Sequence, residues 1–203
     1  NPTMEMHALI ETLRSRLSSW TAEPVPEHHR QRQQAAVLVL IRSGRDPRAV
    51  LTLRSAALSA HAGEVSFVGG KQDQSDRSLE ATALRETQEE LGVPGEALEI
   101  VSPLPGLVSK HGLWVTPFVA LMNESTVLKP NSSEVSEVFE VPIAWLQDDP
   151  RMTTERLERQ GEVQMAPVYE YRGYRIWGLT ALILWDFIRI GLLAPSAAVG
   201  PVL

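Results

Sequence analysis

The chain has 203 residues, a formal net charge of −6 and no cysteine. This length fits one globular domain with a sizeable core, and the lack of cysteine excludes disulfides and thiolate metal sites. The acidic balance argues against non-specific binding to nucleic acid or to a membrane surface, so we expect neither as a partner.

Residues 6–20 place apolar side chains at helical spacing, which predicts an amphipathic helix that packs on the domain. Residues 21–34 are polar, contain proline and are typical of a linker. His28 and His29 are neighbours in this linker, and we expect them to point in different directions without sharing a metal ion. Residues 1–17 lack the apolar core of a signal peptide, and the lack of cysteine suits a reducing cytoplasm, so we expect a cytoplasmic protein.

Two short apolar runs follow, at residues 35–41 (AAVLVLI) and 49–54 (AVLTLR), with turn residues between them. Runs of this length that are rich in β-branched residues predict a buried β-hairpin. Arg54 closes the second strand and, taken alone, suits a surface ion pair.

Residues 65–68 (VSFV) predict one further short strand, which runs into a pair of glycines. Gly69 and Gly70 permit either a plain tight turn or a close approach of the backbone to a ligand. Lys71 follows directly and is able to hold a phosphate as a point charge.

Residues 79–91 predict a helix, with Ser78 as its N-cap and Gly92 as the residue that ends it. Glu86 and Glu90 are four residues apart, so their like charges repel. A divalent cation would remove that repulsion, because hard cations prefer carboxylate oxygens, although a lone acidic run is most often a solvated face. At about 100° per residue, the helix has an apolar side with Ala81, Leu84 and Leu91 and an opposite side with Glu86, Glu89 and Glu90.

Residues 85–93 (RETQEELGV), with Gly70 upstream, resemble the Nudix box, in which G, five residues, E and seven residues precede REUxEExGU, U being aliphatic. The sequence departs from this pattern at three points. Asp76 occupies the first acidic position, one extra residue separates it from Arg85, and Thr87 stands at an aliphatic position.

The resemblance implies an α/β fold, specifically the Nudix-type α/β/α sandwich with a mixed β-sheet. It also implies Mg²⁺ or Mn²⁺ held by three glutamates and the carbonyl oxygen of Gly70. Glu89 is either a ligand or the base that deprotonates water, and Arg85 orients a catalytic glutamate through an ion pair. The expected catalytic group is therefore Arg85, Glu86 and Glu89, and the expected metal ligands are Gly70, Glu86, Glu89 and Glu90.

A second signature narrows the resemblance. Residues 51–55 (LTLRS), Gly63 and residues 67–70 (FVGG) resemble LLTxR[SA]xxxRxxxGxxxFPGG, which marks Nudix enzymes that look like coenzyme A pyrophosphatases. Ser59 replaces the second Arg and Val68 replaces the Pro. The implied reaction is hydrolysis of the diphosphate bond of coenzyme A to 3′-phosphoadenosine 5′-phosphate and 4′-phosphopantetheine.

Downstream of the box, residues 98–101 (LEIV) and 113–122 (LWVTPFVALM) predict strands, and Pro117 suggests that the second is an edge or carries a bulge. The segment between them predicts a loop over the site, from which Lys110 and, less strongly, His111 would contact substrate. The expected substrate-binding residues are thus Arg54, Lys71 and Lys110.

In many Nudix proteins a glutamate from a later segment joins the metal or acts as the base. Here Glu134 and Glu137 both lie in the corresponding region, residues 131–139. The sequence does not choose between them, so Glu89, Glu134 and Glu137 all remain candidates for the base.

The last third of the chain predicts a short helix at residues 143–146, a charged loop at 147–160, and a hairpin of residues 163–169 and 171–177. Residues 178–193 are apolar almost throughout but contain two charges, which favours a buried helix over a membrane-spanning one. We therefore expect three parts: an N-terminal helix and linker (1–34), a Nudix domain (35–194) and a mobile tail (195–203).

Two alternatives stay open. Ser59 and Val68 leave room for a Nudix pyrophosphatase that acts on ADP-ribose, NADH or dinucleoside polyphosphates. A non-catalytic nucleotide-binding protein is the other, although its usual mark would be loss of the helix glutamates, which are all present. In each case the partner is a small nucleotide, and a homodimer is compatible with the sequence.

Overall fold

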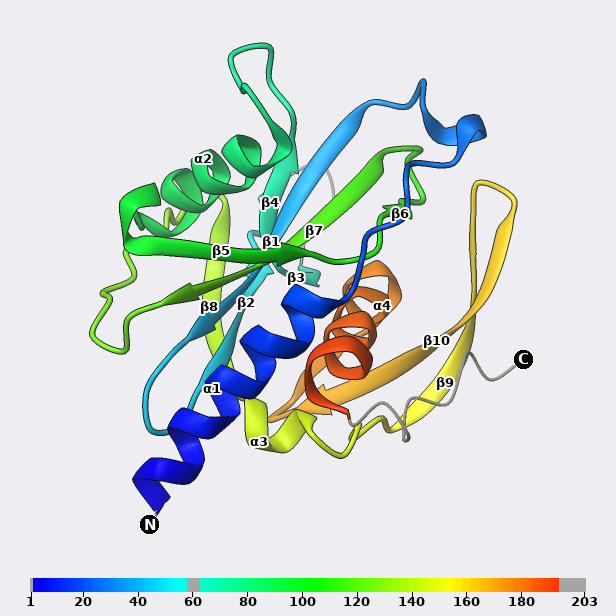
Figure 1. Cartoon of the computed structure of the whole chain (residues 1–203). Helices are drawn as coiled ribbons and strands as arrows, with labels where there is room; N and C mark the ends of the chain where they lie inside the picture. The colour runs from blue at the N-terminus through cyan, green and yellow to red at the C-terminus, as the bar shows by residue number, and fades with distance from the viewer. Residues whose placement is uncertain (1, 58–62, 194–203) are drawn as a thin grey trace.

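The structure, a computed structural model, describes the backbone of residues 2–57 and 63–193 and the side chains of residues 8–57 and 63–193 (Figure 1). Ser59 and the predicted tail lie outside these ranges. Within them, a large mixed sheet is followed by a separate three-stranded sheet. No helix in the described part of the chain has the length and apolar character that crossing a membrane requires.

The large sheet has the strand order β3-β2-β1-β7-β5, with β4 paired to β1, β6 to β7 and β8 to β2. β1 and β7 run parallel, whereas β1 pairs with β2 and β4 in the antiparallel sense. The strands are β1 (Gln34–Arg42), β2 (Arg48–Arg54), β3 (Val65–Ser66), β4 (Val68–Lys71), β5 (Leu98–Pro103), β6 (Leu107–Val108), β7 (Trp114–Met122) and β8 (Val135–Pro142).

Both faces of this sheet are buried. Alternate side chains of a strand point to opposite faces, so Leu38 of β1 packs in one apolar cluster with α2 (Leu79–Leu91), and Val39 packs in another. The second cluster includes α1 (Pro2–Ser19) and α4 (Gly178–Phe187). Figure 1 shows α2 on one side of the sheet and α1 and α4 on the other, which confirms the predicted α/β/α sandwich.

The cap residues of α2 are confirmed. The Ser78 hydroxyl accepts a hydrogen bond from the Ala81 N–H at 3.1 Å, and Gly92 adopts a left-handed φ of 68° while its N–H bonds to Gln88. The β1–β2 hairpin and the short helix α3 (Ile143–Leu146) are confirmed as well. Two single-turn 3₁₀ helices span Glu27–His29 and Gly95–Ala97.

The two terminal helices pack on each other. Leu13 and Leu17 of α1 are 1% exposed, and a Cβ added to Gly191 would lie 2.6 Å from the Leu13 side chain. Gly191 belongs to a π-helical turn (Ile188–Leu192) that continues α4. The predictions of an amphipathic first helix and a buried last helix are both confirmed, and glycine permits their close approach.

Two strand predictions need correction. Residues 65–68 form two strands, β3 paired with β2 and β4 paired with β1, and the buried side chain of Phe67 lies between them. Pro117 lies in β7, an interior strand between β1 and β5, so the edge alternative was wrong, whereas the β5–β7 pairing does shift register between Ile100 and Ser102. The Pro117 carbonyl accepts a hydrogen bond from the Leu104 N–H. Pro117 lies between the part of β7 that pairs with β5 and the part that pairs with β6, so its missing N–H leaves no strand-pairing hydrogen bond unmade.

The predicted loop at 147–160 was also wrong. Residues Thr153–Arg159 form β9, which pairs with β10 (Glu162–Tyr171), and β10 pairs in turn with β11 (Tyr174–Ile176). Most β9 side chains are exposed, so no apolar periodicity marked the strand. The turn did carry a signal: Gln160 and Gly161 both have positive φ, as in a two-residue hairpin turn.

The expectation that the adjacent histidines point in different directions was wrong. His28 and His29 both face Glu162, with Nε2 atoms 3.6 and 2.6 Å from its Oε1. Their ligand atoms lie close enough together to hold a metal ion. However, Arg32 donates to Nδ1 of His29 at 2.9 Å, so Nε2 carries the ring proton toward Glu162. The cluster is therefore a hydrogen-bonded tie between the linker and the β9–β10 hairpin.

Candidate active site

A cavity of about 640 Å³ opens where α2, strands β3 and β4, the loop at residues 109–113, β9 and α4 meet. Acidic and basic side chains line it together, so it combines the groups that bind cations with the groups that bind anions. Its charged lining residues are Glu64, Glu86, Glu90, Glu134 and Glu158 on the acidic side, and Arg54, Lys71, Lys110 and Arg159 on the basic side.

Glu90 is the most buried of the helix glutamates, with 4% of its surface exposed. Its Oε2 accepts a hydrogen bond from the Gly69 N–H at 2.9 Å. The pKa of Glu90 is raised to about 8, chiefly by burial and also by the charges of Glu86 and Glu134. The hydrogen bond from the Gly69 N–H and the charge of Arg54 oppose this rise. A carboxyl group in this position favours its charged form only when more positive charge is close.

Glu86 lies one helical turn before Glu90 and reaches the same cavity. Burial raises its pKa, and the charge of Arg85 opposes the rise. The carboxylate lies against Gly70, where an added Cβ would be 2.5 Å from Glu86 Oε1. At Gly69 an added Cβ would be 2.3 Å from the Ala36 carbonyl oxygen. The two glycines therefore serve different purposes: Gly69 permits strand pairing, and Gly70 leaves room for a carboxylate.

Arg85 links the loop before α2 to the helix glutamates. Its Nε and Nη2 each bond to a carboxylate oxygen of Asp76 at 2.9 Å, and its Nη1 lies 3.1 Å from Glu86 Oε1. The Asp76 side chain is 4% exposed and also accepts from the Thr82 hydroxyl. The Arg85 guanidinium holds the pKa of Asp76 well below its usual range. The loop before α2 is one residue longer than in the Nudix box and carries Asp76 in place of a glutamate, and the bidentate ion pair with Arg85 still holds this shorter acid against the helix.

Glu89 differs from the other two glutamates. It does not line the cavity, its side chain is 51% exposed, and its carboxylate lies 3.3 Å from Arg85 Nη1. The expectation that three acids project together into the site therefore fits Glu86 and Glu90 but not Glu89.

The apolar side of α2 also differs from the prediction. Ala83, Thr87 and Leu91 are fully buried, whereas Ala81 and Leu84 are only partly buried. Small residues let this side pack closely on β1 and β4, and the larger Leu84 lies beside Gly95. The hydroxyl of Thr87 donates to the Ala83 carbonyl at 2.7 Å, so this residue takes an aliphatic position without leaving a buried polar group unpaired.

The predicted substrate-binding residues all lie on the cavity wall. Arg54 projects from the end of β2, and its Nε is buried without a hydrogen-bond partner in the described residues. Lys71 follows the glycine pair and is exposed. Lys110 Nζ lies 3.4 Å from Glu64 and 6.0 Å from the ring centroid of Trp177. His111 lines the same wall.

The structure separates the two later glutamates. Glu134 lines the cavity, and its charge raises the pKa of both Glu86 and Glu90. Glu137 does not line the cavity, and its carboxylate accepts a hydrogen bond from the Tyr174 hydroxyl on the neighbouring sheet. Of the pair, only Glu134 is placed to act on a bound substrate.

Comparison with known proteins gives the family. The NUDIX domain family matches residues 32–159. The chain belongs to the Nudix hydrolase family. It is 43% identical over 154 residues to "Uncharacterized Nudix hydrolase NudL" of Pectobacterium atrosepticum, covering 76% of this chain and 80% of that protein. It is also 38% identical to "Nudix hydrolase 15, mitochondrial" of Arabidopsis thaliana, over 75% of this chain and 56% of that protein.

Among solved structures, a Nudix hydrolase from M. Smegmatis, RenU, has a TM-score of 0.47 and 26% identity, covering 58% of this chain and 74% of that one. Nudix hydrolases generally use a divalent metal ion such as Mg²⁺ or Mn²⁺. The acidic wall fits such an ion: Glu86, Glu90 and Glu134 repel one another in a partly buried space, and each offers the oxygen ligands that hard cations prefer.

The glycine pair of this Nudix hydrolase provides a test of the site. Gly70→Ala is expected to lower the rate by about 100-fold, because its Cβ displaces the Glu86 carboxylate. It should cost less than about 1 kcal/mol of unfolding free energy, since a flexible side chain gives way. Gly69→Ala should instead cost about 2 kcal/mol or more, because its Cβ meets backbone. Urea unfolding and initial rates separate the two, and a fully active Gly70→Ala enzyme would show that the position of Glu86 is unimportant.

Sequence reasoning missed several contributors to the cavity, among them a buried cation and an aromatic ring. Arg159, at the end of β9, and Trp177, just before α4, both line it. They come from the part of the chain predicted as a loop and from a strand end, far from the Nudix box. Only the Gln160-Gly161 turn signal pointed to the strand that carries Arg159, and nothing in the sequence pointed that strand toward the box.

Proposed function

We propose that this Nudix hydrolase cleaves the diphosphate bond of coenzyme A or its derivatives in the presence of Mg²⁺ or Mn²⁺. One observation supports this most directly. Arg54, which belongs to the coenzyme A signature, lines the same cavity as Glu86 and Glu90 of the Nudix box. Arg54 and the two glutamates lie at opposite ends of the stretch that the two signatures cover, but their charged side chains line one cavity.

The proposed ligands of the cation are Glu86, Glu90 and the Gly70 carbonyl, and Glu89 is proposed to support them through Arg85 rather than directly. When bound, the cation neutralises charge on the phosphoryl oxygens and makes water more acidic. Arg54, Lys71 and Lys110 bind the diphosphate oxygens, and Arg85 fixes Glu86 by its ion pair.

In the proposed reaction, Glu134 takes a proton from water as the water oxygen attacks one phosphorus of the diphosphate. The bond from that phosphorus to the bridging oxygen breaks, and the bridging oxygen leaves with the other phosphate. The products are 3′-phosphoadenosine 5′-phosphate and 4′-phosphopantetheine. A Glu134→Gln variant that retains the wild-type rate would exclude Glu134 as the base.

The proposal predicts that the purified protein with Mg²⁺ or Mn²⁺ converts coenzyme A to these two products, and that EDTA abolishes the reaction. Chromatographic separation of the products measures it. ADP-ribose, NADH and a dinucleoside polyphosphate serve as comparison substrates. Rapid turnover of any of these without turnover of coenzyme A would assign the alternative Nudix substrate class. Saturable nucleotide binding with no metal-dependent turnover would assign the non-catalytic class.

A further inference from the structure

Arg159 is a buried cation on the cavity wall, contributed by a different sheet from the one that carries the Nudix box. It ends β9, 3% of its surface is exposed, and it lines the same cavity as Lys110 and Trp177. Figure 1 shows α2 on one side of the molecule and the β9–β10 hairpin on the other. Arg159 and the helix glutamates therefore reach the cavity from elements on different sides of the molecule.

The guanidinium of Arg159 is only partly used by the protein. Its Nε donates to the Val108 carbonyl at 2.7 Å, and its Nη2 donates to the Gln164 side-chain oxygen at 3.4 Å. Its Nη1 is buried and has no hydrogen-bond partner in the described residues. A buried hydrogen-bond donor without a partner destabilises the fold. An acceptor on a bound ligand would supply the partner that Nη1 of Arg159 lacks among the described residues.

Neighbouring carboxylates do not neutralise Arg159. Burial lowers the pKa of Arg159, and the charge of Glu162 opposes this, but the Glu162 carboxylate is bonded to His29 Nε2 at 2.6 Å. Glu158 lies 3.5 Å from Nη1 of Arg156. No described carboxylate comes within 4.0 Å of the Arg159 guanidinium, which stays charged because arginine does not lose its proton in proteins.

We propose that Arg159 binds a second anionic group of the substrate, a phosphate monoester separate from the diphosphate that is cleaved. This inference rests on the proposed function, because in coenzyme A the 3′-phosphate is the one anion outside the diphosphate. A guanidinium and a phosphate form short, charge-assisted hydrogen bonds. The side-chain adjustment that brings Nη1 to the ligand is of the kind common on binding. Arg159 then acts as a specificity-determining residue.

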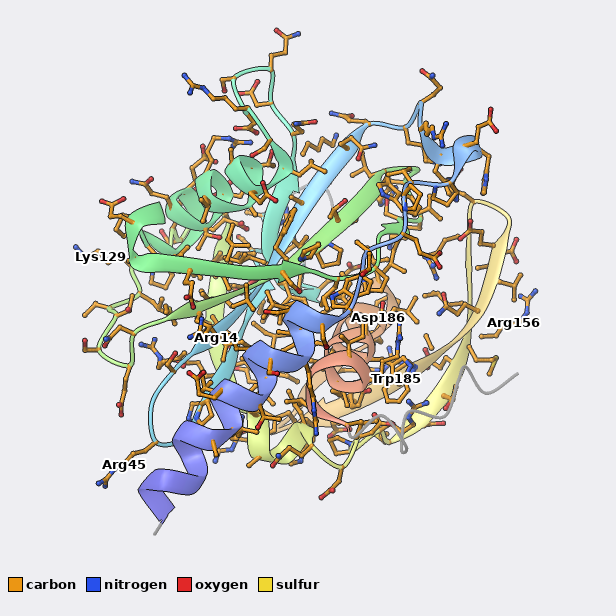
Figure 2. All side chains as sticks on the ribbon, in the orientation of Figure 1. Arg14, Arg45, Lys129, Arg156, Trp185 and Asp186 are labelled. Atoms are coloured by element: carbon orange, nitrogen blue, oxygen red, sulfur yellow. The ribbon has the colours of Figure 1, made fainter. Side chains whose placement is uncertain are left out.

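Coenzyme A and dephospho-coenzyme A, which lacks only the 3′-phosphate, provide the test. Arg159→Gln is expected to lower the ratio of kcat/KM for coenzyme A over dephospho-coenzyme A by about 10- to 100-fold. Arg159→Lys should keep part of the preference, because it keeps the charge. The matched control is Arg45→Gln: Arg45 is exposed, lies outside the cavity lining and projects from the molecule in Figure 2, so both substrates should behave as with the wild type.

Equal losses on both substrates would overturn the inference and leave Arg159 as a support for the Val108 backbone. Binding keeps this outcome separate from failure of the proposed function. Calorimetry on the wild type should show adenosine 3′,5′-bisphosphate binding about 10-fold or more tightly than AMP, with the difference lost in Arg159→Gln. If this difference appears but coenzyme A is not hydrolysed, the proposed function fails and the phosphate site stands. If neither nucleotide is distinguished, the phosphate site fails.

Discussion

Glu90→Gln is expected to lower kcat by about 100-fold or more and to leave the metal-free fold at least as stable as the wild type. The rate falls because the amide cannot supply the negative charge that holds the proposed cation beside the substrate. The fold survives because glutamine retains an oxygen for the Gly69 N–H and removes an ionisable group from a site that is 4% exposed.

The pH dependence of stability gives this prediction a second readout. The pKa of Glu90 is raised to about 8 in the folded protein, from about 4.3 in an unfolded chain. The folded state therefore binds this proton more tightly, and the stability that Glu90 contributes is full below about pH 4 and is lost as the pH rises through about 8. Without added metal, the unfolding free energy of Glu90→Gln relative to the wild type should increase by on the order of a few kcal/mol between pH 5 and pH 8.

Urea unfolding in EDTA at these two pH values measures the difference, and initial rates with Mg²⁺ measure kcat. Glu80→Gln is the matched control, because Glu80 is an exposed acid on the same helix and lies outside the cavity lining. It should change neither quantity appreciably. A Glu90→Gln enzyme with nearly wild-type turnover would show that the cation is held elsewhere.

The sequence predicted the helix and the sheet well, for local reasons. The caps of α2 depend on side-chain and backbone geometry within a few residues, which Ser78 and Gly92 display directly. The run at residues 35–41 is apolar throughout because both faces of β1 are covered. Both features are encoded by neighbouring residues, so a single sequence suffices to find them.

The rest of the site depends on contacts between distant segments. Glu89 and Glu90 are neighbours in the motif, but the close packing of Ala83 and Thr87 on the sheet turns Glu90 inward and leaves Glu89 exposed. A helical wheel that only separates an apolar from an acidic side does not distinguish Glu89 from Glu90, because the rotation of α2 about its axis depends on the volumes of the side chains that pack on the sheet. Arg159 reaches the cavity only through the pairing of β9 with β10, whose strand pattern is mostly polar.

Arg85→Met is expected to have the second large effect, on stability and rate together. It leaves the buried Asp76 carboxylate without its cation while Thr82 still donates to it. Removing one partner of a buried ion pair costs about 3 kcal/mol. The rate should also fall by about 100-fold, because Glu86 loses the guanidinium that fixes its carboxylate.

Acid provides the decisive check on Arg85→Met. In the wild type, the pKa of Asp76 is held below its ordinary value, so its stabilising contribution is present above about pH 4 and is lost as the pH falls toward the folded pKa. In Arg85→Met the Asp76 carboxyl is buried without a cation, so its protonation at low pH stabilises the folded state instead. The stability difference between the two proteins should therefore be largest near pH 7 and should shrink toward pH 3, in urea titrations at each pH. Arg77→Met, at an exposed position in the same loop, should show no such dependence. A difference that stays constant with pH would mean that Asp76 is not the group that Arg85 stabilises.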